Sequence, residues 1–159
     1  DSEFRFGGPG ISEGFSQGGS LTYYGAGGTR IVYENGAVFR MNGDNGVMIK
    51  EPDLLVGDTI VYSLYGLQGS AEPVSGDRTI LVVGERTNRD VPVDNRTAGA
   101  NVTLTINSTQ ASVWQRYYDG LNGVTTNTSG SADLNVTFAG DSHEKFVVHR
   151  TAARIEFTD

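Results

Sequence analysis

Short β-rich runs separated by turn residues dominate this chain and favour a fold built from many strands. The clearest case joins residues 29–34 to residues 37–41 through Asn35-Gly36. Asn-Gly between two such runs is a strong hairpin signal, because both residues accept the positive φ of a type I′ turn. Glycine is frequent, at 22 of 159 residues, and supplies further turns. The pattern predicts a meander of strands that begins near residue 21.

Alternating apolar and polar residues predict further strands along the chain. Residues 59–65 are apolar at most positions and should form a central strand, and residues 79–83 should form another. In residues 101–106 the apolar side chains point one way, whereas Asn101, Thr103 and Thr105 point the other. The expected strands cover residues 21–24, 29–34, 37–41, 47–50, 59–65, 79–83, 101–106, 134–138, 146–149 and 154–157. Residues 66–78, 86–99 and 122–131 are expected to be loops.

One segment has helical periodicity. Ser108 or Thr109 can cap its N-terminus, and Gly120 or Gly123 can end it in the left-handed conformation. We expect a helix over about residues 109–121, with Trp114 as its anchor on the sheet. Helical spacing places four apolar side chains on one face: Val113, Trp114, Tyr117 and Leu121.

These elements predict a mainly β protein. We expect an antiparallel β-sandwich or partly open β-barrel of about eight to ten strands with one packed α-helix. Residues 1–20 lack a sustained period and are interpreted as a Gly-rich N-terminal segment, a loop or linker with an apolar anchor. Residues 21–159 are interpreted as a single β-rich globular domain.

Composition narrows the classes of function. The formal net charge of −7 disfavours binding to a phosphate backbone, so we expect no nucleic-acid partner. The absence of cysteine excludes a disulfide framework and any cysteine-ligated metal. Ten arginines, two lysines and an excess of Asp over Glu suit a protein hydrated at high salt, although an ordinary acidic secreted domain has a similar balance. No apolar stretch is long enough to cross a membrane.

Five Asn-x-Ser/Thr tripeptides crowd the second half of the chain. Each is a potential N-glycan acceptor, and a glycan must point into water outside the cytosol. Random placement predicts about 1.7 such tripeptides in this composition. The alternative interpretation is a Thr-rich strand region in which Thr and Asn alternate on solvent faces. The candidate acceptors are Asn95, Asn101, Asn107, Asn127 and Asn135, and all five are predicted to face solvent.

The histidines do not form a recognisable catalytic or metal motif. His143 and His149 are six residues apart, which is not the spacing of a metal pair on one helix face. His143 follows Asp141-Ser142, but adjacent residues point in different directions and cannot form a Ser-His-Asp relay. We expect both histidines to be solvated or hydrogen-bonded structural residues.

Other polar groups are also better explained by structure than by chemistry. Residues 42–46 resemble a calcium loop but lack its alternating ligands, so a hairpin turn is expected. Glu51, Asp53 and Asp58 cluster in sequence, as do Asp90 and Asp94, without showing the separation that a glycosidase pair needs. No glycine pattern predicts a phosphate-binding loop. Tyrosines at 23–24, 62, 65 and 117–118 are expected in the core or on sheet surfaces, with a sugar-binding platform as the alternative.

Two stretches resemble a known group of proteins. Residues 30–40, continuing to Gly46-Val47-Met48-Ile49, are similar to a stretch of haloarchaeal type IV pilin-like secreted or cell-surface proteins. Residues 104–108 and 114–118 resemble a second element of the same proteins, and the last strands also fit. The resemblance implies a β-rich soluble head that follows a hydrophobic N-terminal helix. It also implies N-glycans on the surface.

We therefore expect a non-enzymatic extracellular domain at the cell surface, with a structural or adhesive role. Its expected partners are other copies of itself, other cell-surface proteins and surface glycans. Membrane contact would use only an N-terminal helix missing from this sequence. We expect no catalytic residue, no cofactor and no metal site. The alternative is a carbohydrate- or ligand-binding β-sandwich, and a hydrolase would require His143 or His149 in a cleft beside a hydroxyl or carboxylate.

Overall fold

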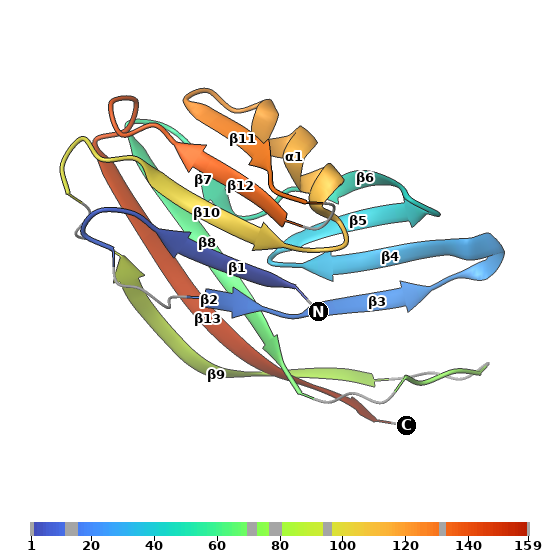
Figure 1. Cartoon of the computed structure of the whole chain (residues 1–159). Coiled ribbons are helices and arrows are strands. Elements are labelled where there is room, and N and C mark those ends of the chain that lie inside the picture. The colour runs from blue at the N-terminus through green and yellow to red at the C-terminus, as the bar shows by residue number, and fades with distance from the viewer. Residues whose placement is uncertain are drawn as a thin grey trace.

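The computed structural model describes residues 2–11, 16–69, 73–76, 81–93, 97–130 and 133–158. Three sheets, one α-helix and a short 3-10 turn at Ala26–Gly28 make up the fold (Figure 1). The prediction of a mainly β, sandwich-like protein with one helix is confirmed. The described residues form thirteen strands rather than eight to ten. In these residues no helix is long and apolar enough to span a membrane.

The first sheet has five antiparallel strands in the order β11-β12-β10-β1-β2. Their bounds are Val124–Thr128 (β11), Asp133–Phe138 (β12), Val102–Asn107 (β10), Glu3–Gly7 (β1) and Ser16–Gly18 (β2). The loop predictions for residues 1–20 and 122–131 are therefore wrong where β1, β2 and β11 lie. Phe4 and Phe6 are buried on either side of the exposed Arg5, but such a short alternation is hard to recognise in sequence. In β11, Val124 is the only apolar residue.

The second sheet is the predicted meander. Its strands follow in the order β3-β4-β5-β6, with bounds Ser20–Tyr24, Thr29–Glu34, Ala37–Asn42 and Asn45–Lys50. Asn35 and Gly36 have φ values of 46° and 80°, as the predicted hairpin turn requires. The Asn35 side chain donates from Nδ2 to Tyr62 Oη (3.2 Å) and accepts from the Tyr65 backbone N–H (2.8 Å). The turn is thereby held against a strand of the third sheet.

Replacing Gly36 with Ala should destabilise the protein by more than the same change at Gly43. Both glycines have left-handed φ, which costs an L-residue about 1–2 kcal/mol. A Cβ on Gly36 would also lie 3.0 Å from the Tyr65 ring, whereas a Cβ on Gly43 would meet nothing within 4 Å. Urea unfolding of Gly36→Ala and Gly43→Ala measures the difference. Equal losses would show that the turn does not press on Tyr65.

The third sheet has the order β7-β8-β13-β9. Its strands are Leu54–Leu55 (β7), Thr59–Gln68 (β8), Lys145–Thr158 (β13) and Leu81–Val93 (β9). β8 is central, as predicted, but it pairs in parallel with β13. β13 is one strand where two were expected, because Arg150 to Ala153 interrupt the apolar pattern without interrupting the backbone pairing.

Two predictions fail in β9. This strand lies at the edge of the sheet, whereas residues 79–83 were expected to form a central strand; residues 79–80 lie outside the described part. It also continues to Val93, through part of the predicted loop 86–99. The polar sequence is compatible with an edge strand, because charged residues there discourage pairing with another chain.

The helix α1 spans Ala111–Asp119, inside the predicted range. The N-cap is Gln110, and no side chain caps the helix, so the prediction that Ser108 or Thr109 caps it is wrong. Ser108 Oγ instead accepts the backbone N–H of Gln110 at 2.9 Å just before the helix. Gly123 has a φ of +71°, whereas Gly120 is helical. Trp114 is fully buried, as predicted, and so is Tyr118, which the predicted apolar face had omitted.

The core lies between the first sheet on one side and the other two sheets with α1 on the other (Figure 1). Phe6 and Phe138 of the first sheet each pack edge-to-face on Phe146 of β13, with ring centroids 5.5 and 5.2 Å apart. Phe4 and Phe39 pack in the same manner on Trp114 at 5.2 and 5.3 Å. This core buries one face of the first sheet and leaves the other face to solvent.

Candidate functional site

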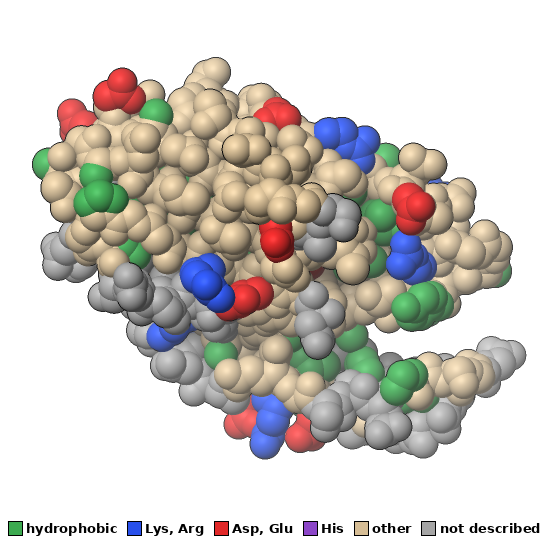
Figure 2. Space-filling model, viewed as in Figure 1, with side chains coloured by type: hydrophobic (Ala, Val, Ile, Leu, Met, Phe, Trp, Pro, Cys, Tyr) green, Lys and Arg blue, Asp and Glu red, His purple; other side chains and the backbone are tan. Residues whose placement is uncertain are grey.

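The solvent face of the first sheet is a surface of Thr and Asn. In β10, Val102, Leu104 and Ile106 are fully buried, so Thr103, Thr105 and Asn107 point outward. Figure 2 shows that the surface above these strands has few charged side chains. We call this surface the Thr/Asn face. It comprises the outward side chains of four strands: Glu3 and Arg5 in β1; Thr103, Thr105 and Asn107 in β10; Asp133, Asn135 and Thr137 in β12; Thr125 and Asn127 in β11.

Four of the five candidate acceptors lie on or beside the Thr/Asn face. Asn101 precedes β10 and is exposed, as are Asn107 and Asn127, whereas Asn135 is half-buried. The predicted outward direction of Asn101 and Asn135 is confirmed by the burial of their neighbours. Asn127 lies in β11 and not in the expected loop. Asn95 lies outside the described residues.

The side-chain amides of these asparagines differ in their hydrogen bonds. Asn107 Nδ2 donates to Asp133 Oδ1 at 2.5 Å, and Asn101 Oδ1 accepts the Gly140 backbone N–H at 2.9 Å. Asn135 is held on both sides: its Oδ1 accepts from Thr105 Oγ1 at 3.1 Å, and its Nδ2 donates to Ser129 Oγ at 3.4 Å. The four amides are therefore not equivalent as nucleophiles.

The second sheet exposes a different kind of surface on the face opposite the core. The register places Tyr23, Ile31, Arg40 and Val47 in one row across its four strands. Tyr23 and Val47 are 69% and 64% exposed, and Ile49 beside the bulge in β6 is 57% exposed. None of the five tripeptides falls in these strands. This apolar surface, which we call the sequon-free face, is suited to contacts with other proteins.

The two histidines have different surroundings. His143 is buried, and its Nδ1 lies 2.8 Å from the carbonyl oxygen of Gly57, which links the start of β13 to the start of β8. His149 lies within β13 and is half-buried. Ser142 Oγ bonds to Asp141 at 3.5 Å. The expected hydrogen-bonded structural role is confirmed for His143.

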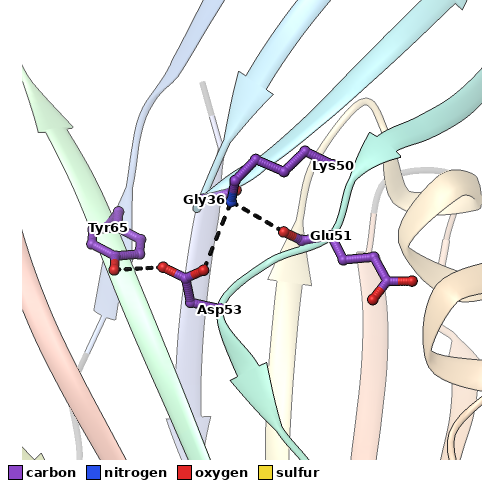
Figure 3. A network of polar contacts seen from close by, with 5 residues as sticks. All are labelled: Gly36, Lys50, Glu51, Asp53 and Tyr65. Atoms are coloured by element: carbon purple, nitrogen blue, oxygen red, sulfur yellow. Dashed lines mark hydrogen bonds and ion pairs between the residues drawn. The ribbon is translucent and has the colours of Figure 1, made fainter.

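The acidic cluster near residue 53 forms part of a structural clamp (Figure 3). Lys50 Nζ donates to the carbonyl oxygens of Gly36 (2.7 Å) and Glu51 (3.2 Å) and lies 3.7 Å from Asp53 Oδ1. Asp53 Oδ2 accepts from Tyr65 Oη at 2.6 Å, and this hydrogen bond raises the pKa of Tyr65. The clamp connects β6, the Asn35-Gly36 turn and β8.

The remaining carboxylates and the calcium-like loop do not assemble a metal site in the described part of the chain. Residues 42–46 form the predicted turn of a hairpin, with Asn42 opposite Asn45. No group of three metal-ligating side chains occurs among the described residues. Asp94 lies outside these residues.

A buried carboxylate was missed by the sequence analysis. Glu34 ends β4 and is 1% exposed, and its Oε2 accepts from Ser108 Oγ at 3.0 Å. Ser2 and Trp114 also direct polar groups toward it, yet Glu34 Oε1, Ser2 Oγ and Trp114 Nε1 have no hydrogen-bonding partner within the described structure. Burial raises the pKa of Glu34, and the hydroxyl of Ser108 opposes this effect. The only sequence signal is a charged residue at the end of an apolar run.

The tyrosine pairs divide between core and surface. Tyr62 and Tyr118 are fully buried and share a hydrogen bond between their hydroxyls. Burial raises the pKa of both hydroxyls above the ordinary value of 10. Tyr23 and Tyr24 are 69% and 73% exposed. The alternative interpretation, a sugar-binding platform, therefore still applies to these two tyrosines.

A family model matches residues 12–156, which includes most of all three sheets and the helix. No curated protein and no solved structure matches the chain. The chain belongs to DUF7289, a family of unknown function.

Proposed function

We propose that this protein is a non-enzymatic extracellular domain at the cell surface, with a structural or adhesive role. The observation that carries the proposal is the placement of four candidate glycan acceptors on or beside one outer sheet face. Glycans on this face would project away from the core and leave the packing of the sandwich unchanged. The net charge of −7 also favours a body that stays hydrated outside the cell.

The two exposed faces would then have different roles. The Thr/Asn face is polar and would remain toward solvent, whereas the sequon-free face has exposed Tyr23, Val47 and Ile49 available for contact. The partners that we propose are other copies of the chain, other cell-surface proteins or surface glycans. The resemblance to haloarchaeal pilin-like proteins supports a soluble head carried by a hydrophobic N-terminal helix that lies outside this sequence.

Protease treatment of intact cells of the source organism tests the location. We expect peptides of this chain in the medium before lysis, while a cytosolic marker protein remains uncut. Release of the peptides only after lysis would contradict the proposal. The result does not depend on glycosylation.

Exposure of Tyr23 and Tyr24 favours a second candidate, a carbohydrate-binding module. Aromatic faces bind sugars by stacking, so a Tyr23→Ala/Tyr24→Ala double variant should lose at least tenfold in affinity for a polysaccharide that the wild type binds. Val47→Ala, in the same row of the sheet as Tyr23, is the matched control. Titration calorimetry with surface polysaccharide from the source organism measures the effect, and no heat of binding for the wild type would remove this candidate.

A further inference from the structure

We propose that Asn127 is an N-glycan acceptor on the Thr/Asn face and that Asn135, its cross-strand partner, is not. This inference rests on the proposed extracellular location, because the glycan donor is supplied outside the cytosol. It distinguishes two tripeptides that the sequence presents as equal. The distinction comes from the position of each strand in the sheet and from the bonds of each amide.

Asn127 is placed where a glycan can be accommodated. It is exposed, and β11 is the last strand of its sheet, so one flank has no neighbouring strand in the described structure. Ser129 follows β11 at a bend, and its Oγ accepts from Asn135 Nδ2 at 3.4 Å, which places the hydroxyl on the same face of the sheet as Asn127. Asn127 therefore lies at the open edge of the sheet, with the hydroxyl of its tripeptide on the same face.

Asn135 is placed where a glycan would cost native contacts. It lies in β12, between β10 and β11, and is half-buried. Its Nδ2, the atom that would be glycosylated, already donates to Ser129 Oγ, and its Oδ1 accepts from Thr105. A sugar on Nδ2 would replace one of its two hydrogens and would have to fit beside the Ser129 and Thr105 side chains that the amide already contacts.

The two sites also exclude each other. Asn127 and Asn135 are directly opposite in the β11–β12 register. Directly opposed residues on one face have Cβ atoms only about 4.5–5.5 Å apart. Two glycans leaving the sheet from this pair would occupy the same space, so one acceptor is compatible with the fold. The open flank of β11 favours Asn127.

Transfer of the glycan to Asn127 forms one bond and breaks another. Nδ2 of Asn127 attacks the anomeric carbon of a lipid-phosphate-linked sugar. A carbon–nitrogen bond forms while the carbon–oxygen bond to the lipid phosphate breaks, and the lipid phosphate leaves with the electron pair. Nδ2 transfers one proton to a base of the glycosyltransferase. The Ser129 hydroxyl is the part of the tripeptide that the transferase recognises.

Mass spectrometry of the full chain tests the inference. The chain would be expressed in a haloarchaeal host whose own surface glycoprotein, measured in parallel, carries N-glycans. Asn127→Gln and Ser129→Ala should each remove one glycan mass from the intact protein. Asn135→Gln and Thr137→Val, the matched pair at the other site, should leave the intact glycan mass unchanged. Far-UV circular dichroism checks that each variant is folded.

Two results would overturn the inference. One is a wild-type glycopeptide map with sugar at Asn135, and the other is a wild-type chain with no sugar at Asn127. Either result leaves the proposed location in place when protease treatment of intact cells releases the chain. Failure of the protease experiment, by contrast, argues against the location whatever the glycan map shows.

Discussion

Replacing Trp114 with Ala should lower the free energy of unfolding by about 3–5 kcal/mol, the usual cost of removing a large aromatic side chain from a core. Trp114 is fully buried on α1 and joins two sheets, because its ring contacts Phe4 of β1 and Phe39 of β5. It also stacks on Tyr118 with the rings 5.8 Å apart. The cavity left by the change would open where three elements meet.

Urea unfolding followed by far-UV circular dichroism measures this loss, because the variant has no tryptophan fluorescence. Tyr24→Ala removes an aromatic residue that is 73% exposed and should change stability by no more than about 0.5 kcal/mol. Trp114→Phe retains part of the packing and should fall between the two if the alanine variant does not fold. A loss below about 1 kcal/mol for Trp114→Ala would contradict its role as the anchor of the helix.

Replacing Glu34 with Gln should remove a pH dependence from the stability of the protein. Burial raises the pKa of Glu34 in the folded state above its ordinary value of 4.5, which the unfolded chain retains. Between these two pKa values the folded state holds a proton that the unfolded state has released. The free energy of unfolding therefore falls as pH rises through this window. The stabilising contribution is complete below pH 4.5 and is lost above the folded-state pKa.

Gln is neutral at every pH and keeps the shape of Glu. As pH rises from about 4 to about 8, the free energy of unfolding of Glu34→Gln should therefore rise by about 1–3 kcal/mol relative to that of the wild type. This is the range of cost for an imperfectly paired buried polar group. Urea unfolding at several pH values measures the gain. Glu85→Gln breaks an exposed ion pair with Arg154 and should show little change in this difference. Parallel pH curves for Glu34→Gln and the wild type would refute the argument.

The sequence predicted those elements in which local chemistry and burial agree. The Asn35-Gly36 turn needs positive φ at two residues, and apolar and polar residues alternate over the whole length of β10. Both elements could therefore be predicted directly from the sequence. β11 and the second part of β9, residues 86–93, were assigned to loops because they are polar. An edge strand needs backbone pairing on one side only and little apolar sequence. Where such a strand begins and ends depends on the partner strand with which it pairs, and a local sequence pattern does not identify that partner.

The same limit applies to the candidate site. Alternation in β10 and β12 predicted that Asn101 and Asn135 face outward, but not that Asn135 and Asn127 face each other. That pairing depends on the register between two strands, and therefore on tertiary structure. The burial of Glu34 likewise depends on Ser108 and Trp114, which come from a distant part of the chain.

The positions of the first and last strands have a consequence for how the protein folds. β1 lies between β10 and β2, and β13 lies between β8 and β9, so both are interior strands of their sheets. Neither sheet can be completed until segments far apart in sequence have met, and contacts of this kind slow folding. β13 pairs with strands that are made much earlier. A chain synthesised from its N-terminus must therefore wait for β13 before the third sheet can close.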